Sequence, residues 1–185
     1  MNIFVLVLII VGVVVVFLAG WFINTRNKFI RLSSYVDNQY SQIDVQLKRR
    51  YSLIPNIVET VKGYAAHEKD TLEAVISARN YASSQTGIEE IEANKNLNSA
   101  LTKLFAISEN YPDLKANTNF LNLQKELIDT EEKIAKARQF YNDTVTKYNI
   151  AVQSFPGCIA AGSKFQVKPL IQADTTEAGE VRVKF

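Results

Sequence analysis

One short stretch of the sequence has side chains of the types that carry out metal-assisted hydrolysis. His67-Glu68-Lys69-Asp70 begins like the zinc-binding helix motif of metalloproteases, in which a second histidine lies four residues after the first. No second histidine follows, because His67 is the single histidine of the 185 residues. A metal site would have to combine one imidazole with carboxylates alone, and we therefore expect no metal site and no cofactor.

The one cysteine, Cys158, is the other candidate for catalysis. Cys158 and His67 could form a nucleophile and its base, but Cys158 lies in a glycine-containing segment without a recognisable catalytic motif. One cysteine also cannot form a disulfide within the chain. We expect a plain thiol, no catalytic residues and a protein that is not an enzyme.

Charge and composition narrow the class of partner. The chain has 21 Lys and Arg against 19 Asp and Glu, which gives a formal net charge of +2. This charge is too small to attract the phosphates of a nucleic acid, so we expect no nucleic-acid partner. Hydrophobic residues make up 47% of the chain, but they are concentrated in its first 23 residues. The length suits one domain and a membrane anchor.

The N-terminal segment predicts that anchor. From Asn2 to Ile23 no side chain is charged, and a helix of this length spans roughly 33 Å, enough for a hydrocarbon core of about 30 Å. A cleaved signal peptide is the competing interpretation, but it would need a basic start and a small-residue cleavage site. We expect a single-pass transmembrane anchor over residues 1–25 in the lipid bilayer, with Trp21 at the membrane interface.

Basic residues on one side of this segment predict its orientation. Arg26, Lys28 and Arg31 follow the apolar run and complete the expected set of interface residues, whereas only Met1 and Asn2 precede it. The positive-inside rule then places the rest of the chain in the cytoplasm. The opposite orientation stays an alternative.

Apolar residues recur every three or four positions after the anchor, which is typical of helices. No Gly or Pro interrupts residues 21–54, so the anchor could continue into the first helix of the domain, and Pro55 then kinks that helix or starts a new one. The first positions of this pattern are Phe29, Leu32, Val36, Tyr40, Ile43, Leu47 and Tyr51. It resumes at Val58, Val61, Ala65, Leu72 and Val75 and ends near Tyr81.

Two further helices are predicted. One contains Ile91 to Ile107 and stops at Tyr111-Pro112, because a residue before proline disfavours helical geometry. The other runs from about Phe120 to Val152 with near-heptad spacing, which predicts antiparallel packing as in bundles and coiled coils, and it ends at Phe155-Pro156-Gly157. We expect an irregular tail over residues 161–185, partly ordered near its start.

Blocks of the sequence resemble the LemA family of bacterial membrane proteins. They are Gln46 to Asn56, Val58 to Tyr64, His67-Glu68, Ser108 to Asn117, Asn119-Phe120, Leu123-Gln124, Glu126-Leu127, Thr130-Glu131, Ile134-Ala135, Ala137-Arg138, Tyr141-Asn142, Tyr148-Asn149, Phe155-Pro156 and Ile159-Ala160. Ser52 departs from a more usual Asp, and the tail lacks the aromatic-glycine-aromatic ending of many members.

The resemblance implies an all-α fold, in which an N-terminal span continues into an antiparallel bundle of three to four long helices over residues 26–160. It implies a protein of the bacterial cytoplasmic (inner) membrane without an established enzymatic activity. Related magnetosome proteins look like factors in membrane organisation.

Polar residues within these blocks are candidate structural or subunit-contact residues. They are Arg49, Arg50, Pro55, Asn56, Glu59, His67, Tyr111, Pro112, Asp113, Asn119, Arg138, Tyr141 and Asn142. We expect Lys48, Arg49 and Arg50 to face different directions, and interhelical ion pairs to join the basic residues to carboxylates such as Glu126 and Glu131. For His67 we expect a hydrogen-bonded position in the bundle.

The amides of the same blocks suggest caps and contacts. We expect Asn117 and Asn119 to cap the last helix, because Asn favours helix N-termini. For Asn56, Asn142 and Asn149, hydrogen bonding in the core and contact with another subunit both stay open.

These observations favour a non-catalytic, membrane-anchored scaffold or interaction protein that forms a homo-oligomer at the membrane surface, since confinement to a plane raises the effective concentration of subunits. The alternative is an adaptor or regulatory subunit of a membrane enzyme such as a protease, with a membrane protein as its partner. An undetected enzyme is the remote alternative.

Overall fold

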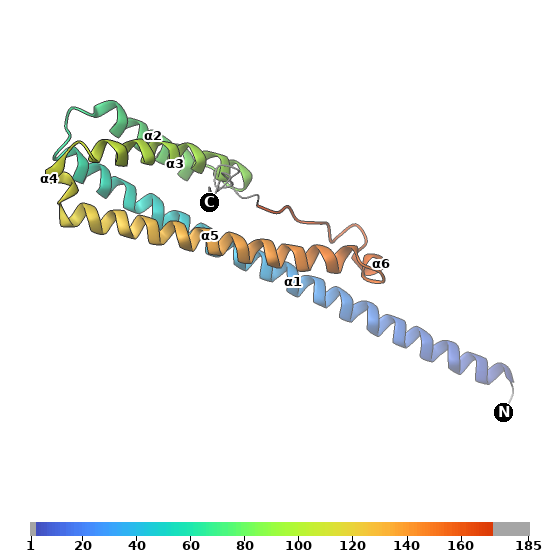
Figure 1. Cartoon of the computed structure of the whole chain (residues 1–185). Coiled ribbons are helices and arrows are strands. Elements are labelled where there is room, and N and C mark those ends of the chain that lie inside the picture. Colours follow the sequence, from blue (N-terminus) through green and yellow to red (C-terminus); the bar gives the residue numbers. More distant parts are fainter. Residues whose placement is uncertain (1–2, 172–185) are drawn as a thin grey trace, which may run out of the picture. The chain divides into compact units, whose positions relative to one another are not determined.

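A computed structural model describes residues 3–171, except for the side chains of residues 88, 91 and 92, and most of these residues are helical. The helices are α1 (Ile3–Lys62), α2 (Lys69–Ser84), α3 (Ile88–Ser108), α4 (Pro112–Lys115), α5 (Thr118–Gln153) and α6 (Gly157–Ala161) (Figure 1). No residue of the described range is in a strand. The prediction of an all-α fold is confirmed.

Helix α1 carries the predicted anchor. It is one helix of 60 residues, and Pro55 lies inside it without ending it. Its N-terminal part is long and apolar enough to cross a membrane, and none of that apolar window is buried by the rest of the protein. Continuity of the apolar segment with the first bundle helix is therefore as predicted.

The chain divides into two compact units, and each of the long helices α1 and α5 contributes to both. Unit 1 contains Met1–Tyr40 and Arg138–Phe185, and unit 2 contains Ser41–Ala137. The boundaries predicted near residues 25 and 160 stay predictions.

Unit 1 has a core in which aromatic rings of both long helices take part. The rings of Tyr40 and Tyr141 lie 6.0 Å apart, and those of Phe29 and Phe165 lie 5.3 Å apart, both in edge-to-face geometry. A Cβ on Gly157 would lie 2.5 Å from the Ala151 carbonyl oxygen, so only glycine fits where α6 begins. Other buried residues of this unit are Val36, Val145, Tyr148, Val152, Ala160, Ala161 and Ile171.

Unit 2 contains the hairpin of α2 and α3, which a short turn joins. Gly87 lies in this turn with φ +68°, where a residue with a Cβ would be strained. The apolar stripes predicted from the sequence supply most of its core: Ile43, Leu47, Val61, Leu72, Val75, Leu97, Leu104, Phe120, Leu127 and Ile134 are buried. Ile54 and Leu114, which were not among the predicted positions, are buried too. Full burial of each such side chain stabilises the fold by about 1.5–3 kcal/mol.

The helical pattern predicted from Val58 to Tyr81 is broken in the structure. Helix α1 ends at Lys62 and α2 begins at Lys69, and backbone bonds from Ala65 to Val61 and from Glu68 to Ala65 close the turn between them. Ala65 and Leu72 are both buried although they lie on different sides of this break. Their seven-residue spacing imitates two helical turns, which explains the incorrect prediction.

The chain after α5 partly follows the expected course. Helix α5 ends at Gln153, close to Phe155-Pro156-Gly157 as predicted, and the short helix α6 was not anticipated. Gly162, with φ +55°, then turns the chain into the segment 163–171, which we call the strap. The rest of the predicted tail, residues 172–185, lies outside the described residues.

Candidate functional site

A buried arginine is the centre of the polar cluster in unit 2. Arg50 of α1 is 2% exposed, and its Nε lies 2.7 Å from Glu131 Oε1 on α5. Its two terminal nitrogens donate to Asn94 Oδ1 on α3, at 2.9 Å, and to Asn98 Oδ1. A buried charge needs such partners, because an uncompensated one costs several kcal/mol. Arg50 thus joins α1 to α3 and to α5.

Tyr51 continues the same cluster. Its hydroxyl donates to Glu90 Oε1 at 3.2 Å and accepts from Asn94 Nδ2 at 2.8 Å. Burial, as the main cause, raises the pKa of Tyr51 to about 12. The phenol therefore stays neutral, as a hydrogen-bonding group between helices should.

Neighbouring basic residues face other partners, as predicted. Lys48 pairs with Asp44 one turn earlier on α1, at 2.7 Å, and Arg49 pairs with Glu126 on α5, at 2.5 Å. Both pairs are well exposed, and such pairs contribute little stability. The three consecutive cations Lys48, Arg49 and Arg50 therefore do not form one ligand site.

Pro55 creates an acceptor that α2 uses. A proline inside a helix has no N–H for the carbonyl four residues earlier, which here belongs to Tyr51. Arg79 Nε of α2 donates to this Tyr51 oxygen at 3.0 Å. The freed carbonyl is therefore satisfied by the neighbouring helix.

Two asparagines of α5 hold the strap through its main chain in unit 1. Asn149 accepts from Lys168 N and donates to Lys168 O, both at 2.8 Å. Asn142 does the same with Ile171, accepting at 2.9 Å and donating at 2.8 Å. Each side-chain amide thus pairs with the strap as a backbone amide would in a sheet.

The spacing of these amides explains why two contacts form. Seven residues along α5 cover about 10.5 Å, and three residues of extended chain cover about 10 Å. Asn142 and Asn149 therefore match Ile171 and Lys168 in register, and the strap runs antiparallel to α5. Of the two alternatives left open for these asparagines, hydrogen bonding within the chain is the one observed.

Side chains at the edge of the strap add contacts. The Tyr141 hydroxyl donates to Pro169 O at 3.2 Å, and Lys168 Nζ lies 2.6 Å from Asp37 Oδ1 on α1. Lys168 Nζ also lies 5.6 Å from the centre of the Tyr148 ring, close enough for a cation–π interaction. The strap therefore connects α5 to α1 within unit 1.

The turn before α5 confirms one predicted cap and corrects another. Asn117 Oδ1 accepts from Phe120 N at 3.0 Å, which is an N-cap, and Asn117 Nδ2 donates to the Tyr64 hydroxyl at 2.9 Å. Asn119 is exposed inside α5 and caps nothing, because one N-cap residue already precedes the helix. Tyr111, just before α4, donates to Glu68 Oε1 at 3.2 Å.

Several candidate residues lie exposed at the end of unit 2, where α1 ends and α5 begins. We call Asn56, Glu59, His67, Asp113 and Asn119 the end surface; all five are exposed. His67 has no hydrogen-bond partner among the described residues, so its predicted position in the bundle is wrong: it lies in the connection after α1. A groove of about 710 Å³ between α1 and α2 is lined by Glu59, among others.

The remaining candidates occupy less informative positions. Pro112 is the first residue of α4, where its missing N–H costs nothing. Arg138 is half-buried on α5. Over the described residues, no group of three or more His, Cys, Asp or Glu side chains lies close enough together to hold a metal ion.

The predicted interface residues lie on two sides of α1. The Arg26 guanidinium lies over the rings of Phe22, at 5.4 Å, and of Phe165, at 5.5 Å. Arg31 is exposed. Trp21 and Lys28 line a groove in unit 1 instead.

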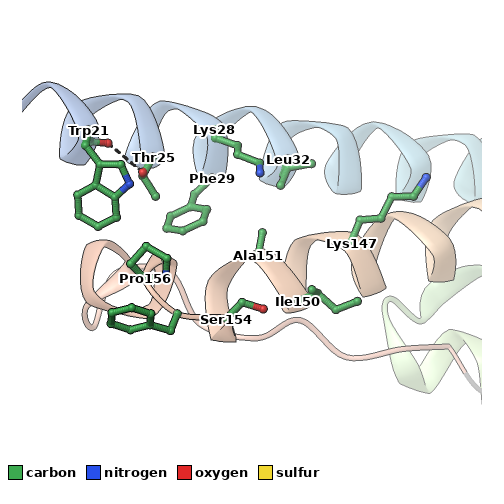
Figure 2. A pocket seen from close by; sticks show the side chains of 12 residues that line it. Trp21, Thr25, Lys28, Phe29, Leu32, Lys147, Ile150, Ala151, Ser154 and Pro156 are labelled. Carbon is green, nitrogen blue, oxygen red and sulfur yellow. Dashed lines mark hydrogen bonds between the residues drawn. The ribbon is translucent and has the colours of Figure 1, made fainter.

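That groove lies between α1 and the end of α5 and has a volume of about 540 Å³. Figure 2 shows Trp21 and Pro156 at one end of it and Lys28 and Lys147 further along. The other lining residues are Thr25, Phe29, Leu32, Ile150, Ala151, Ser154, Phe155 and Gly157. The Thr25 hydroxyl is already used, since it donates to Trp21 O at 2.8 Å.

Sequence reasoning missed Asn94 and Asn98, which lie outside the resembling blocks. For Arg79 it predicted an ion pair between helices, whereas Arg79 donates to the Tyr51 carbonyl. Asn94 and Asn98 are four residues apart and so share a helix face, which is a usable signal for a buried polar partner. Pro55 inside an apolar helical pattern is a second signal, because the carbonyl it frees needs a donor.

Comparison with known proteins agrees with the sequence blocks. A family model described as the LemA family matches residues 39–185. Protein LemA of Metamycoplasma hominis is 24% identical over 163 residues, which cover 86% of this chain and 74% of that protein. Magnetosome protein MamQ of Magnetospirillum gryphiswaldense is 26% identical over 157 residues, 70% of this chain. The chain spans only 58% of the length of that relative.

Proposed function

The chain belongs to the LemA family, and from this premise we propose that it is a non-catalytic scaffold, anchored in a membrane by α1 and assembled with copies of itself at the membrane surface. The observation that carries this proposal is the use of its polar side chains. Arg49, Arg50, Asn142 and Asn149 each bind another helix or the strap. These four side chains therefore have structural roles, and they do not gather into a group that could act on a substrate.

Anchoring supports assembly by physical reasoning. A helix of the length and composition of α1 could cross a bilayer and would hold all copies in one plane. Confinement raises their effective concentration, so that modest interfaces suffice.

The end surface is where we place the contact between subunits. Its five polar residues belong to the blocks that resemble the family, yet they are exposed, and Asp113 and Asn119 have no side-chain partner among the described residues. The groove beside Glu59 adds apolar area from Pro55 and Ile76, which are half-buried. Polar residues around an apolar patch are typical of interfaces.

Cross-linking of the full chain in native membranes tests assembly. We expect multimers, and we expect Asp113→Arg with Asn119→Arg to reduce them several-fold by placing like charges in the contact. The control Glu132→Arg with Lys133→Glu changes exposed residues of α5 away from the end surface. Monomer alone at native abundance would contradict the proposal, and a stoichiometric second protein after mild extraction would replace it with the adaptor function.

Orientation can be tested with the natural thiol. We propose that the chain after the apolar segment lies in the cytoplasm of a bacterium, with the apolar part of α1 in the inner membrane, because Arg26, Lys28 and Arg31 follow that segment. Cys158 is the one cysteine and is exposed. An impermeant maleimide should label it only after the membrane is permeabilised, and labelling of intact cells, absent in Cys158→Ser, would show the opposite orientation.

A further inference from the structure

The groove of unit 1 changes in character along its length. Trp21 and Pro156 lie at one end of it, and Lys28 and then Lys147 lie further along it (Figure 2). Phe155, which precedes Pro156 in the chain, also lines the groove. Trp21 lies near the C-terminal end of the apolar segment, at the position where tryptophans mark a membrane interface. Lys28 lies about 10.5 Å further along α1, away from that segment.

Exposed apolar side chains flank the Trp21 end of the groove. Phe155 is 81% exposed, and Ile159 of α6 is 62% exposed. Ile150, which is 58% exposed, lies further along the groove, near Lys147 (Figure 2). Large apolar side chains gathered beside a membrane segment suit contact with lipid better than contact with water. The turn between α5 and α6 therefore has the surface of an interfacial element.

The lysines are available for an anionic ligand. Lys28 and Lys147 are exposed and form no ion pair within the described part of the chain. Of the described residues that line the groove, none is acidic. Arg26 by contrast is held between two aromatic rings on another side of α1. The positive end of the groove thus lacks an internal counter-charge.

We propose that this groove binds one anionic phospholipid, with the headgroup phosphate at Lys28 and Lys147 and an acyl chain along Trp21, Phe155 and Pro156. The order of the two ends matches the order of a lipid, since the apolar end adjoins the apolar segment of α1. The inference rests on the proposed insertion of α1 in the membrane. It does not depend on self-assembly.

Titration of the purified full chain with lipid in detergent tests the groove. The probes are phosphatidylglycerol, the zwitterionic phosphatidylcholine and the soluble glycerol 3-phosphate, and native mass spectrometry counts the lipids bound per chain. We expect one phosphatidylglycerol per chain. Trp21 is the sole tryptophan, so phosphatidylglycerol with brominated acyl chains should quench its fluorescence. The quenching should saturate at the same lipid concentration as the binding measured by mass spectrometry.

The charge variant is Lys28→Gln with Lys147→Gln. A lysine near an anionic headgroup strengthens binding about fivefold, so this variant should bind phosphatidylglycerol about 25-fold more weakly. The matched control, Lys133→Gln with Lys136→Gln, removes the same charge from exposed residues of α5 outside the groove and should change binding less than twofold.

Three results would overturn the inference: equal weakening in the control, equal affinity for phosphatidylcholine, or displacement of the lipid by glycerol 3-phosphate at similar concentration. Alkaline extraction and cross-linking of the same variants distinguish failure of the lipid-binding proposal from failure of the scaffold proposal. Loss of lipid selectivity with α1 still inserted and multimers still formed would concern the groove alone. Release of the wild-type chain by alkali would instead remove the premise of both.

Discussion

Replacing Arg79 by methionine tests whether Pro55 and Arg79 act as a pair. The substitution keeps much of the aliphatic length but removes the donor to the Tyr51 carbonyl, 3.0 Å away. A hydrogen bond from a charged donor contributes about 1.5–3 kcal/mol net, and Arg79 is only half-buried, so we expect a loss of about 1.5 kcal/mol. For a chain of this size that corresponds to a fall of about 3–6 °C in Tm.

The proline decides how large this loss is. In Pro55→Ala the new N–H can bond to the Tyr51 carbonyl inside α1, so Arg79→Met should then cost only about 0.5 kcal/mol. The expected coupling between the two positions is about 1 kcal/mol. Pro55→Ala alone should not destabilise, because alanine is favoured over proline within a helix by up to about 3 kcal/mol.

The assay is thermal unfolding of the full chain in detergent, followed by circular dichroism for the wild type, both single variants and the double variant. Lys103→Met, an exposed lysine of α3, controls for the loss of one positive charge. If Arg79→Met lowered stability by the same amount in the wild type and in Pro55→Ala, the reasoning would be refuted. The arginine would then act through general packing or charge.

Two further predictions concern the strap and pH. Asn142→Leu with Asn149→Leu should speed amide hydrogen exchange at Lys168 and Ile171 at least tenfold, measured by mass spectrometry, while Asn56→Leu, an exposed change in α1, should leave these amides unaffected. Burial raises the Tyr51 pKa from 10.0 to about 12, so above pH 10 the unfolded phenol loses its proton before the folded one does. Stability should therefore fall as pH rises from 10 to 12, and chemical denaturation should show a shallower fall for Tyr51→Phe; an unchanged slope would contradict the assignment.

The helical stripes could be predicted because burial follows local periodicity. Phe29, Val36, Ile43 and Leu47 are spaced to share one face of a helix, and all four are buried. The break between α1 and α2 could not be found in this way, since Ala65 and Leu72 keep a helical interval across it. Periodicity records which residues are buried, and several backbone paths can bury the same residues.

Polar partners were predicted where opposite charges suggested an ion pair, or where a helix start suggested a cap, as at Asn117. The pairs of Arg49 with Glu126 and of Arg50 with Glu131 follow from charge and helix position. The contacts of Asn142 with the strap have no such signal, because an amide can pair with any backbone. Which segment it meets depends on the tertiary path of residues 163–171.

The asparagine contacts with the strap also govern how this part of the sequence can vary. Because Asn142 and Asn149 bind only main-chain atoms, side chains between Lys168 and Ile171 are free to change, whereas the number of residues between them is not. An inserted residue would lengthen that interval by about 3.3 Å and move one amide pair out of register. Tails with very different side chains could therefore bind to the same α5, provided that three extended residues separate the two positions that pair with Asn149 and Asn142.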